Sequence, residues 1–92
     1  MDIAKIIYYR PTKGKSITVS LRDLCLREEC ELEDVFYVVK DAIDTNDLLC
    51  RLRRICCDCL EFESETPEYI RFTVVDVYGN TNYLKFRKKK EK

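Results

Sequence analysis

The sequence predicts an α+β domain in which three helices form a core between two β-hairpins, in the order β-β-α-α-α-β-β. Two observations lead to this prediction. Runs rich in β-branched and aromatic residues surround turn sequences near both ends of the chain. Between them, apolar residues recur with the period of an amphipathic helix. We expect residues 1–84 to form one compact domain and residues 85–92 to form a basic C-terminal tail.

The two hairpins are predicted from their alternating strands and their turn residues. In the first, the strands IAKIIYYR and SITVS surround PTKGK, where Pro11 and Gly14 suit a turn. In the second, the segments YIRFTVVDVY and YLKFRKK alternate around the turn sequence GNTN. The acidic segment EFESETPE, which precedes the second hairpin, is interpreted as a linker.

Three amphipathic helices are predicted in the middle of the chain. The first begins near Ser20, a suitable N-cap residue, and places Leu21 and Leu24 on one side. The second lies within ELEDVFYVVKDAI, where Val35 and Val39 belong to an apolar side. The third follows DTND, which breaks the pattern and supplies a new N-cap. Its apolar side holds Leu48, Leu52, Ile55, Cys56 and Cys59, and its other side holds Cys50, Arg53, Arg54 and Cys57.

The composition is that of a charged protein with an uneven charge distribution. Charged residues make up 37% of the chain, and histidine and tryptophan are absent, a composition like that of small proteins from hyperthermophilic archaea or their viruses. The net charge is zero, but residues 21–69 carry six basic and fourteen acidic side chains, whereas residues 85–92 carry six basic and one acidic. No signal peptide or membrane-spanning segment is evident, so we expect a cytoplasmic protein, in the host cytoplasm if it is viral.

Six cysteines raise the question of disulfides or metal binding. Three interpretations remain open: disulfides from the first pair to the later cluster, an all-thiolate zinc site, and reduced core residues. No glycine accompanies these cysteines as in zinc knuckles, so no metal is expected. On the helical pattern, Cys56 and Cys59 should be buried and Cys50 and Cys57 exposed. The candidates for disulfide formation are Cys25, Cys30, Cys56 and Cys59.

The residues available for catalysis are few. Without histidine, a cysteine nucleophile has no imidazole base, and the chain has no glycine-rich phosphate loop. We therefore expect no enzyme, no cofactor and no small-molecule substrate.

Residues 20–43, SLRDLCLREECELEDVFYVVKDAI, resemble a helix-turn-helix motif. The match runs through Leu21 and Leu24, with Cys25 where a small residue allows close helix approach and Cys30 in the turn; it continues through Val35, Val39 and Ala42. With the second hairpin as a wing, the outline is similar to a winged helix-turn-helix domain. The resemblance implies a winged-helix-like fold and a transcriptional regulator that binds double-stranded DNA.

The expected DNA contacts are basic residues of the third helix and of the C-terminal segment. The outward side of the second helix is mostly acidic and therefore unsuited to phosphates. The predicted DNA-binding residues are Lys40, Arg51, Arg53, Arg54, Lys85, Arg87, Lys88, Lys89 and Lys90. The alternative is a non-catalytic protein-interaction domain, as a homodimer, that binds no nucleic acid and uses the acidic helix side and exposed tyrosines.

Overall fold

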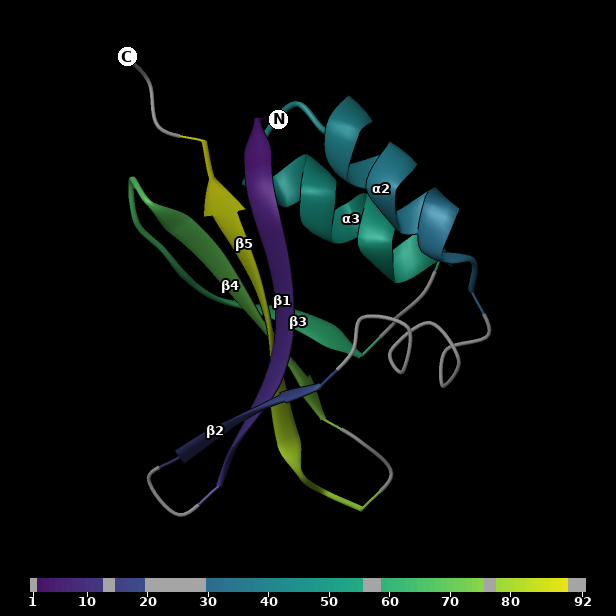
Figure 1. Cartoon of the computed structure of the whole chain (residues 1–92). Helices are drawn as coiled ribbons and strands as arrows, with labels where there is room; N and C mark the ends of the chain where they lie inside the picture. Colours follow the sequence, from purple (N-terminus) through teal and green to yellow (C-terminus); the bar gives the residue numbers. More distant parts are fainter. Residues whose placement is uncertain (1, 13–14, 20–29, 56–58, 76–77, 90–92) are drawn as a thin grey trace.

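One antiparallel β-sheet is the framework of the protein (Figure 1). The structure is a computed structural model that describes residues 2–12, 15–19, 30–55, 59–75 and 78–89. The sheet has five strands in the order β2-β1-β5-β4-β3. The elements are β1 (Ile3–Thr12), β2 (Lys15–Val19), α2 (Leu32–Asp41), α3 (Thr45–Ile55), β3 (Leu60–Glu65), β4 (Tyr69–Val75) and β5 (Thr81–Lys88).

The two helices of the described residues, α2 and α3, lie on the same side of the sheet (Figure 1). In β4 and β5 every second side chain is buried, because alternate residues of a strand point to opposite faces. The helices bury their apolar sides against this surface and complete a single core. The sheet contributes Tyr8, Leu60, Ile70, Phe72, Val74, Leu84 and Phe86, and the helical segment contributes Val35, Val39, Ala42, Leu48, Leu49 and Leu52.

Both predicted hairpins and two of the predicted helices are present. β1 pairs with β2, and β4 pairs with β5, antiparallel in each case. Gly79, in the turn between β4 and β5, has a φ of +81°, a conformation that glycine adopts without a steric penalty. The helix α3 begins after Asp44, whose Oδ1 accepts a hydrogen bond from the backbone N–H of Asp47 (2.8 Å). The DTND sequence therefore supplies the N-cap, as predicted.

The predicted fold class, a winged-helix-like domain with a three-helix core, is wrong. The protein is a β-rich α+β domain in which the described residues include two helices against one large sheet. The segment interpreted as an acidic linker contains the edge strand β3, which pairs with β4 along its whole length and places Leu60 in the core, with a bulge between Phe62 and Ser64. The predicted first helix falls largely on residues 20–29, which lie outside the described residues, and so does much of the helix-turn-helix resemblance.

The basic segment at the C-terminus begins inside the sheet. Strand β5 continues to Lys88, so residues 85–88 belong to the central strand and not to a tail. The reason is that KFRK continues the alternation of the preceding residues and pairs with β1 on one side and β4 on the other. Within the described residues, no helix is long and apolar enough to cross a membrane.

The cysteine predictions are correct in part. Cys50 is exposed on α3, as expected. Cys59 is also exposed and is not in a disulfide, and its Sγ lies 3.7 Å from the carbonyl oxygen of Val75, so its predicted burial and disulfide are wrong. The reason is that α3 ends at Ile55, and the helical phase does not extend to residue 59. Cys30 is half-buried against the core. Cys25, Cys56 and Cys57 lie outside the described residues, so pairing among the other candidates stays a prediction.

A buried amide connects the two strands at the centre of the sheet. Asn82 of β5 is fully buried, and its Nδ2 donates to the hydroxyl of Tyr8 (2.8 Å). Its Oδ1 accepts a hydrogen bond from Nε of Arg10 (2.7 Å), two residues further along β1. One side chain of β5 thus binds two side chains of β1. A shift in the pairing of β1 with β5 would break both hydrogen bonds, so they favour the observed register.

We predict that Asn82→Ala lowers the free energy of unfolding by about 1–3 kcal/mol, because it removes partners from polar groups in a buried network. The matched control is Thr81→Ala, the exposed neighbour on the same strand, for which we expect a change within about 0.5 kcal/mol. Urea unfolding followed by circular dichroism measures both. Equal losses in the two variants would contradict a specific role for Asn82.

Candidate functional site

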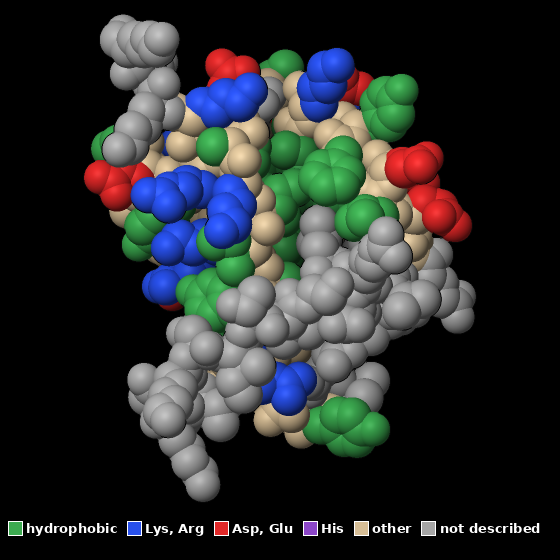
Figure 2. Space-filling view, viewed as in Figure 1, with side chains coloured by type: hydrophobic (Ala, Val, Ile, Leu, Met, Phe, Trp, Pro, Cys, Tyr) green, Lys and Arg blue, Asp and Glu red, His purple; other side chains and the backbone are tan. Residues whose placement is uncertain are grey.

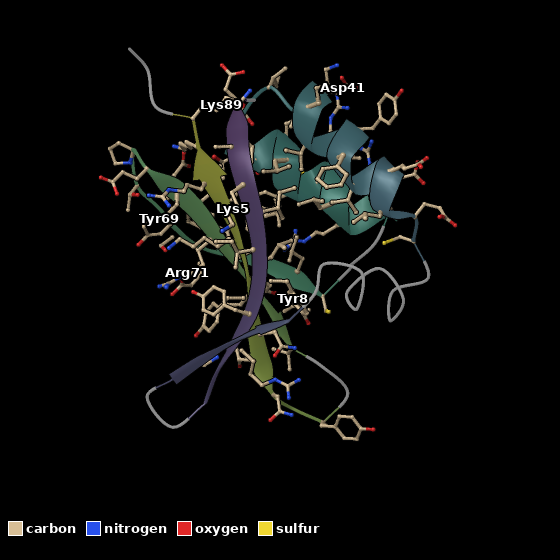
Figure 3. All side chains as sticks on the ribbon, viewed as in Figure 1. Lys5, Tyr8, Asp41, Tyr69, Arg71 and Lys89 are labelled. Carbon is tan, nitrogen blue, oxygen red and sulfur yellow. The ribbon has the colours of Figure 1, made fainter. Side chains whose placement is uncertain are left out.

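The face of the sheet opposite the helices carries a concentration of tyrosine and basic side chains. Its residues alternate with the core residues along β1, β4 and β5 and are exposed or half-buried. Figure 3 shows Tyr69 and Arg71 on the side of the sheet away from α2, which ends at Asp41. We call this surface the open face; it consists of Lys5, Ile7, Tyr9, Tyr69, Arg71, Thr73, Tyr83, Lys85 and Arg87.

Strand register arranges these nine residues in three rows across the sheet. Residues directly opposite each other on neighbouring strands lie side by side on the same face. Because β5 lies between β1 and β4, each of its outward side chains has one neighbour on either side. The rows are Tyr9–Tyr83–Thr73, Ile7–Lys85–Arg71 and Lys5–Arg87–Tyr69.

Two stacked tyrosines form the first row. The rings of Tyr9 and Tyr83 have centroids 5.3 Å apart and planes 23° apart. The guanidinium carbon of Arg71 lies 5.2 Å from the centroid of the Tyr83 ring, in a cation–π contact. Nη1 of Arg71 also donates to the Tyr9 hydroxyl (3.3 Å). The arginine therefore contacts both tyrosines and holds them as one unit.

Glu63 of β3 holds Arg71 in this position. Nη2 of Arg71 donates to Oε1 of Glu63 (2.9 Å), and Nε donates to Oε2, so the pair is bidentate. The hydrogen bonds from Arg71 lower the pKa of Glu63 below its ordinary value, and those same bonds raise the pKa of Arg71. This ion pair orients the guanidinium and offsets its charge.

The remaining basic residues of the open face are not neutralised in this way. Nζ of Lys85 lies 4.3 Å from the centroid of the Tyr69 ring, a contact that leaves its charge uncompensated. Within the described part of the chain, Lys5, Lys85 and Arg87 have no carboxylate partner. Figure 2 shows Lys and Arg side chains gathered over the strands, whereas Asp and Glu are prominent over the helical side. Glu61 of β3, opposite Thr73 on the same side of the sheet, adds one carboxylate without an ion pair among the described residues. The three uncompensated basic residues outnumber it, so the open face attracts anions.

The structure divides the DNA-binding residues predicted from sequence between two surfaces. Lys85 and Arg87 lie on the open face. Arg51 and Arg53 lie on α3, in the layer on the other side of the sheet; Arg51 pairs with Asp47 (3.0 Å), and Arg53 donates to the carbonyl oxygen of Leu60 (2.7 Å).

The other predicted residues do not join the open face. Lys40 is on α2, Arg54 is exposed on α3, and Lys89 follows β5. Nζ of Lys88 lies 2.7 Å from Oε2 of Glu65, and Lys88 belongs to the helix-side set of alternating residues. Lys90 lies outside the described residues.

Five tyrosine and basic residues of the open face were absent from the predicted DNA-binding residues. They occupy alternate positions of strands, and the residues between them form the core, as in the segments YIRFTVV and NYLKFRK. Their common signal is alternation of tyrosine or a basic residue with a buried apolar residue. They are Lys5, Tyr9, Tyr69, Arg71 and Tyr83.

Other kinds of site find less support. Among the described residues, no three potential ligands from His, Cys, Asp and Glu lie close enough to hold a metal ion. Comparison with protein families, curated protein sequences and solved structures found no match to this chain. The geometry and charge of the open face are therefore the features of the molecule that indicate a function.

We predict that the Glu63–Arg71 pair makes stability depend on pH in the acid range. The folded state lowers the pKa of Glu63 from its ordinary value of 4.5, so the stabilisation is complete above that value and is lost as the pH falls through the lowered pKa. Glu63→Gln should therefore be less stable than wild type at about pH 6, and the difference should shrink towards about pH 3.

Urea unfolding across this pH range measures the effect, with Glu61→Gln on the same strand as the control. Glu61 has no ion pair among the described residues. If the two variants gave the same dependence on pH, the ion pair would not be the cause.

Proposed function

We propose that this chain is a non-enzymatic nucleic-acid-binding protein of the cytoplasm and that the open face is its binding surface. The observation that carries the proposal is the alternation of tyrosines with uncompensated basic residues on one face of the sheet. Lys5, Lys85 and Arg87 attract phosphates, which supply most of the sequence-independent affinity for nucleic acid. The tyrosine rings and the Arg71 guanidinium contribute flat surfaces for contacts with bases or sugars.

The charge of the open face also argues against its being a dimer interface. In a two-fold dimer the same patch occurs on both subunits, so Lys5, Lys85 and Arg87 would face basic residues of the partner copy. Like charges brought together across an interface cost several kcal/mol. A polyanion matches this surface, and a second copy of the same face does not.

We predict that Lys85→Ala combined with Arg87→Ala weakens binding to nucleic acid and flattens its dependence on salt. The probe is a labelled DNA of about 20 nucleotides, long enough to cross the site, as a single strand and as a duplex. Loss of two phosphate contacts should reduce the log–log salt slope by about 1.4 for the single strand or about 1.8 for the duplex. Fluorescence anisotropy at several salt concentrations measures the slope.

The matched control is Arg53→Ala combined with Arg54→Ala, which removes the same charge from α3. The sequence alone favoured these arginines as DNA contacts, whereas the open face requires that their removal leave the slope nearly unchanged. If the salt slope flattened in the α3 variant and stayed unchanged in the Lys85→Ala, Arg87→Ala variant, the binding site would lie on α3 instead of the open face. Absence of binding at about 50 mM salt would overturn nucleic-acid binding itself.

A protein-interaction surface on α2 and the segment that follows it is a second candidate, favoured by exposed apolar side chains. Phe36, Tyr37 and Ile43 are 52%, 68% and 82% exposed, near the acidic residues Glu33 and Asp34. Large aromatic residues are typical anchors of protein interfaces. This surface lies on the helical layer, so it is separate from the open face.

We predict that, if this surface forms a homodimer, Phe36→Glu converts the protein to a monomer while leaving its circular dichroism unchanged. Asn46→Glu, at an exposed position of α3, adds the same single negative charge and is the control. Sedimentation velocity measures the mass. A wild-type protein that sediments as a monomer over the accessible concentration range would exclude the homodimer.

A further inference from the structure

We infer that the open face binds single-stranded nucleic acid in preference to a duplex, with Tyr9, Tyr83 and Arg71 contacting bases and Lys5, Lys85 and Arg87 contacting the backbone. This inference rests on the proposed function and specifies its ligand. It follows from three features of the site: the width of the sheet, the position of the aromatic group, and the direction in which the basic residues extend from it.

The width of the sheet limits what a duplex can contact. At the row that contains Tyr9 and Tyr83, all five strands are paired side by side. Four gaps of about 4.8 Å make this surface about 19 Å across, whereas the major groove of B-DNA is about 12 Å wide. The open face therefore cannot enter the groove to reach base edges. Against a duplex the open face contacts phosphates alone, and its aromatic side chains make no stacking contacts with bases.

The aromatic group suits bases that are unstacked. Single-stranded nucleic acid exposes base faces, and aromatic rings and guanidinium planes stack on them with little preference for sequence. Tyr9 and Tyr83 are already stacked on each other, and Arg71 is fixed between Glu63 and the Tyr83 ring. Because these side chains are held before the ligand arrives, binding sacrifices less side-chain entropy.

The basic residues continue from the aromatic group along one strand. Tyr83, Lys85 and Arg87 are outward residues of β5 at two-residue intervals, so they follow one another at about 6.8 Å. Lys5 of β1 lies beside Arg87. A single strand of nucleic acid that places one base against the tyrosines can extend its backbone along β5. Its phosphates would then lie over Lys85 and, further on, between Lys5 and Arg87. This route covers the length of the open face.

Three probes of one sequence test the inference: a labelled single strand of about 20 nucleotides, its blunt duplex, and a strand of equal length that lacks all bases. We expect the single strand to bind about ten-fold tighter than the duplex and than the abasic strand, since stacking of one base on an aromatic side chain can supply a factor of that size. The single strand is prepared as both DNA and RNA, and comparison of the two affinities shows which backbone the open face prefers.

The variant Tyr83→Leu should lose this ten-fold advantage, so that it binds the three probes with nearly equal affinity. Tyr83→Phe keeps the ring and should retain the advantage, and Tyr37→Leu on α2 is the control for loss of an exposed tyrosine. Because the chain has no tryptophan, quenching of tyrosine emission by the single strand gives a second readout. Circular dichroism checks that each variant is folded.

The outcomes separate the inference from the proposed function. If the wild-type protein bound the duplex as tightly as the single strand or more tightly, or bound the abasic strand as tightly, the preference for single strands would be overturned. If Lys85→Ala combined with Arg87→Ala still weakened binding in that case, the open face would remain the binding site. No effect of the double variant on any probe would overturn the proposed function as well.

Discussion

The pairing of β1 with β5 is the constraint on which the rest of the structure depends. It joins a strand that begins at Ile3 to a strand that ends at Lys88, and it makes β5 the central strand of the sheet. The same pairing places Tyr9 beside Tyr83 and Lys5 beside Arg87. Without it, the two hairpins would be separate, and neither the core nor the open face would be continuous.

Register matters as much as pairing, because a slip of one residue in a strand exchanges its two faces. The buried amide of Asn82, hydrogen-bonded to Tyr8 and Arg10, opposes such a slip from the core side. The helices α2 and α3 oppose it as well, since they cover one face with apolar side chains. Fixing the core face necessarily fixes the opposite face, so the arrangement of tyrosines and basic residues follows from the packing of the core.

Local patterns predicted the elements better than they predicted the fold. The hairpins, α2 and α3 were found because alternation and helical periodicity are contained in short segments. The pairing of β1 with β5 could not be read from either segment, because it joins residues about eighty positions apart. Strand β3 was taken for a linker because its glutamates conceal an alternation that includes Leu60 and Phe62, and Cys59 was misplaced because a helical phase was extended beyond Ile55.

The candidate site was predicted in the same partial way. Lys85 and Arg87 were identified as basic residues of the C-terminal segment, but their neighbours Lys5 and Arg71 come from other strands and became evident only with the strand order. The arginines of α3 formed a second basic cluster in the sequence, beside that of the C-terminal segment. In the folded chain, that helix lies against the other face of the sheet (Figure 1).

The central claim is that nucleic acid lies on the open face, and NMR mapping of side-chain signals tests it most directly. A single-stranded DNA of about 20 nucleotides is added to the isotopically labelled protein, and ring signals of tyrosines and terminal signals of lysines and arginines are followed. The account predicts shifts for Tyr9 and Tyr83 and for the basic residues in the rows beside them, with Arg53 and Arg54 unchanged. Shifts confined to α2 and α3 would contradict it.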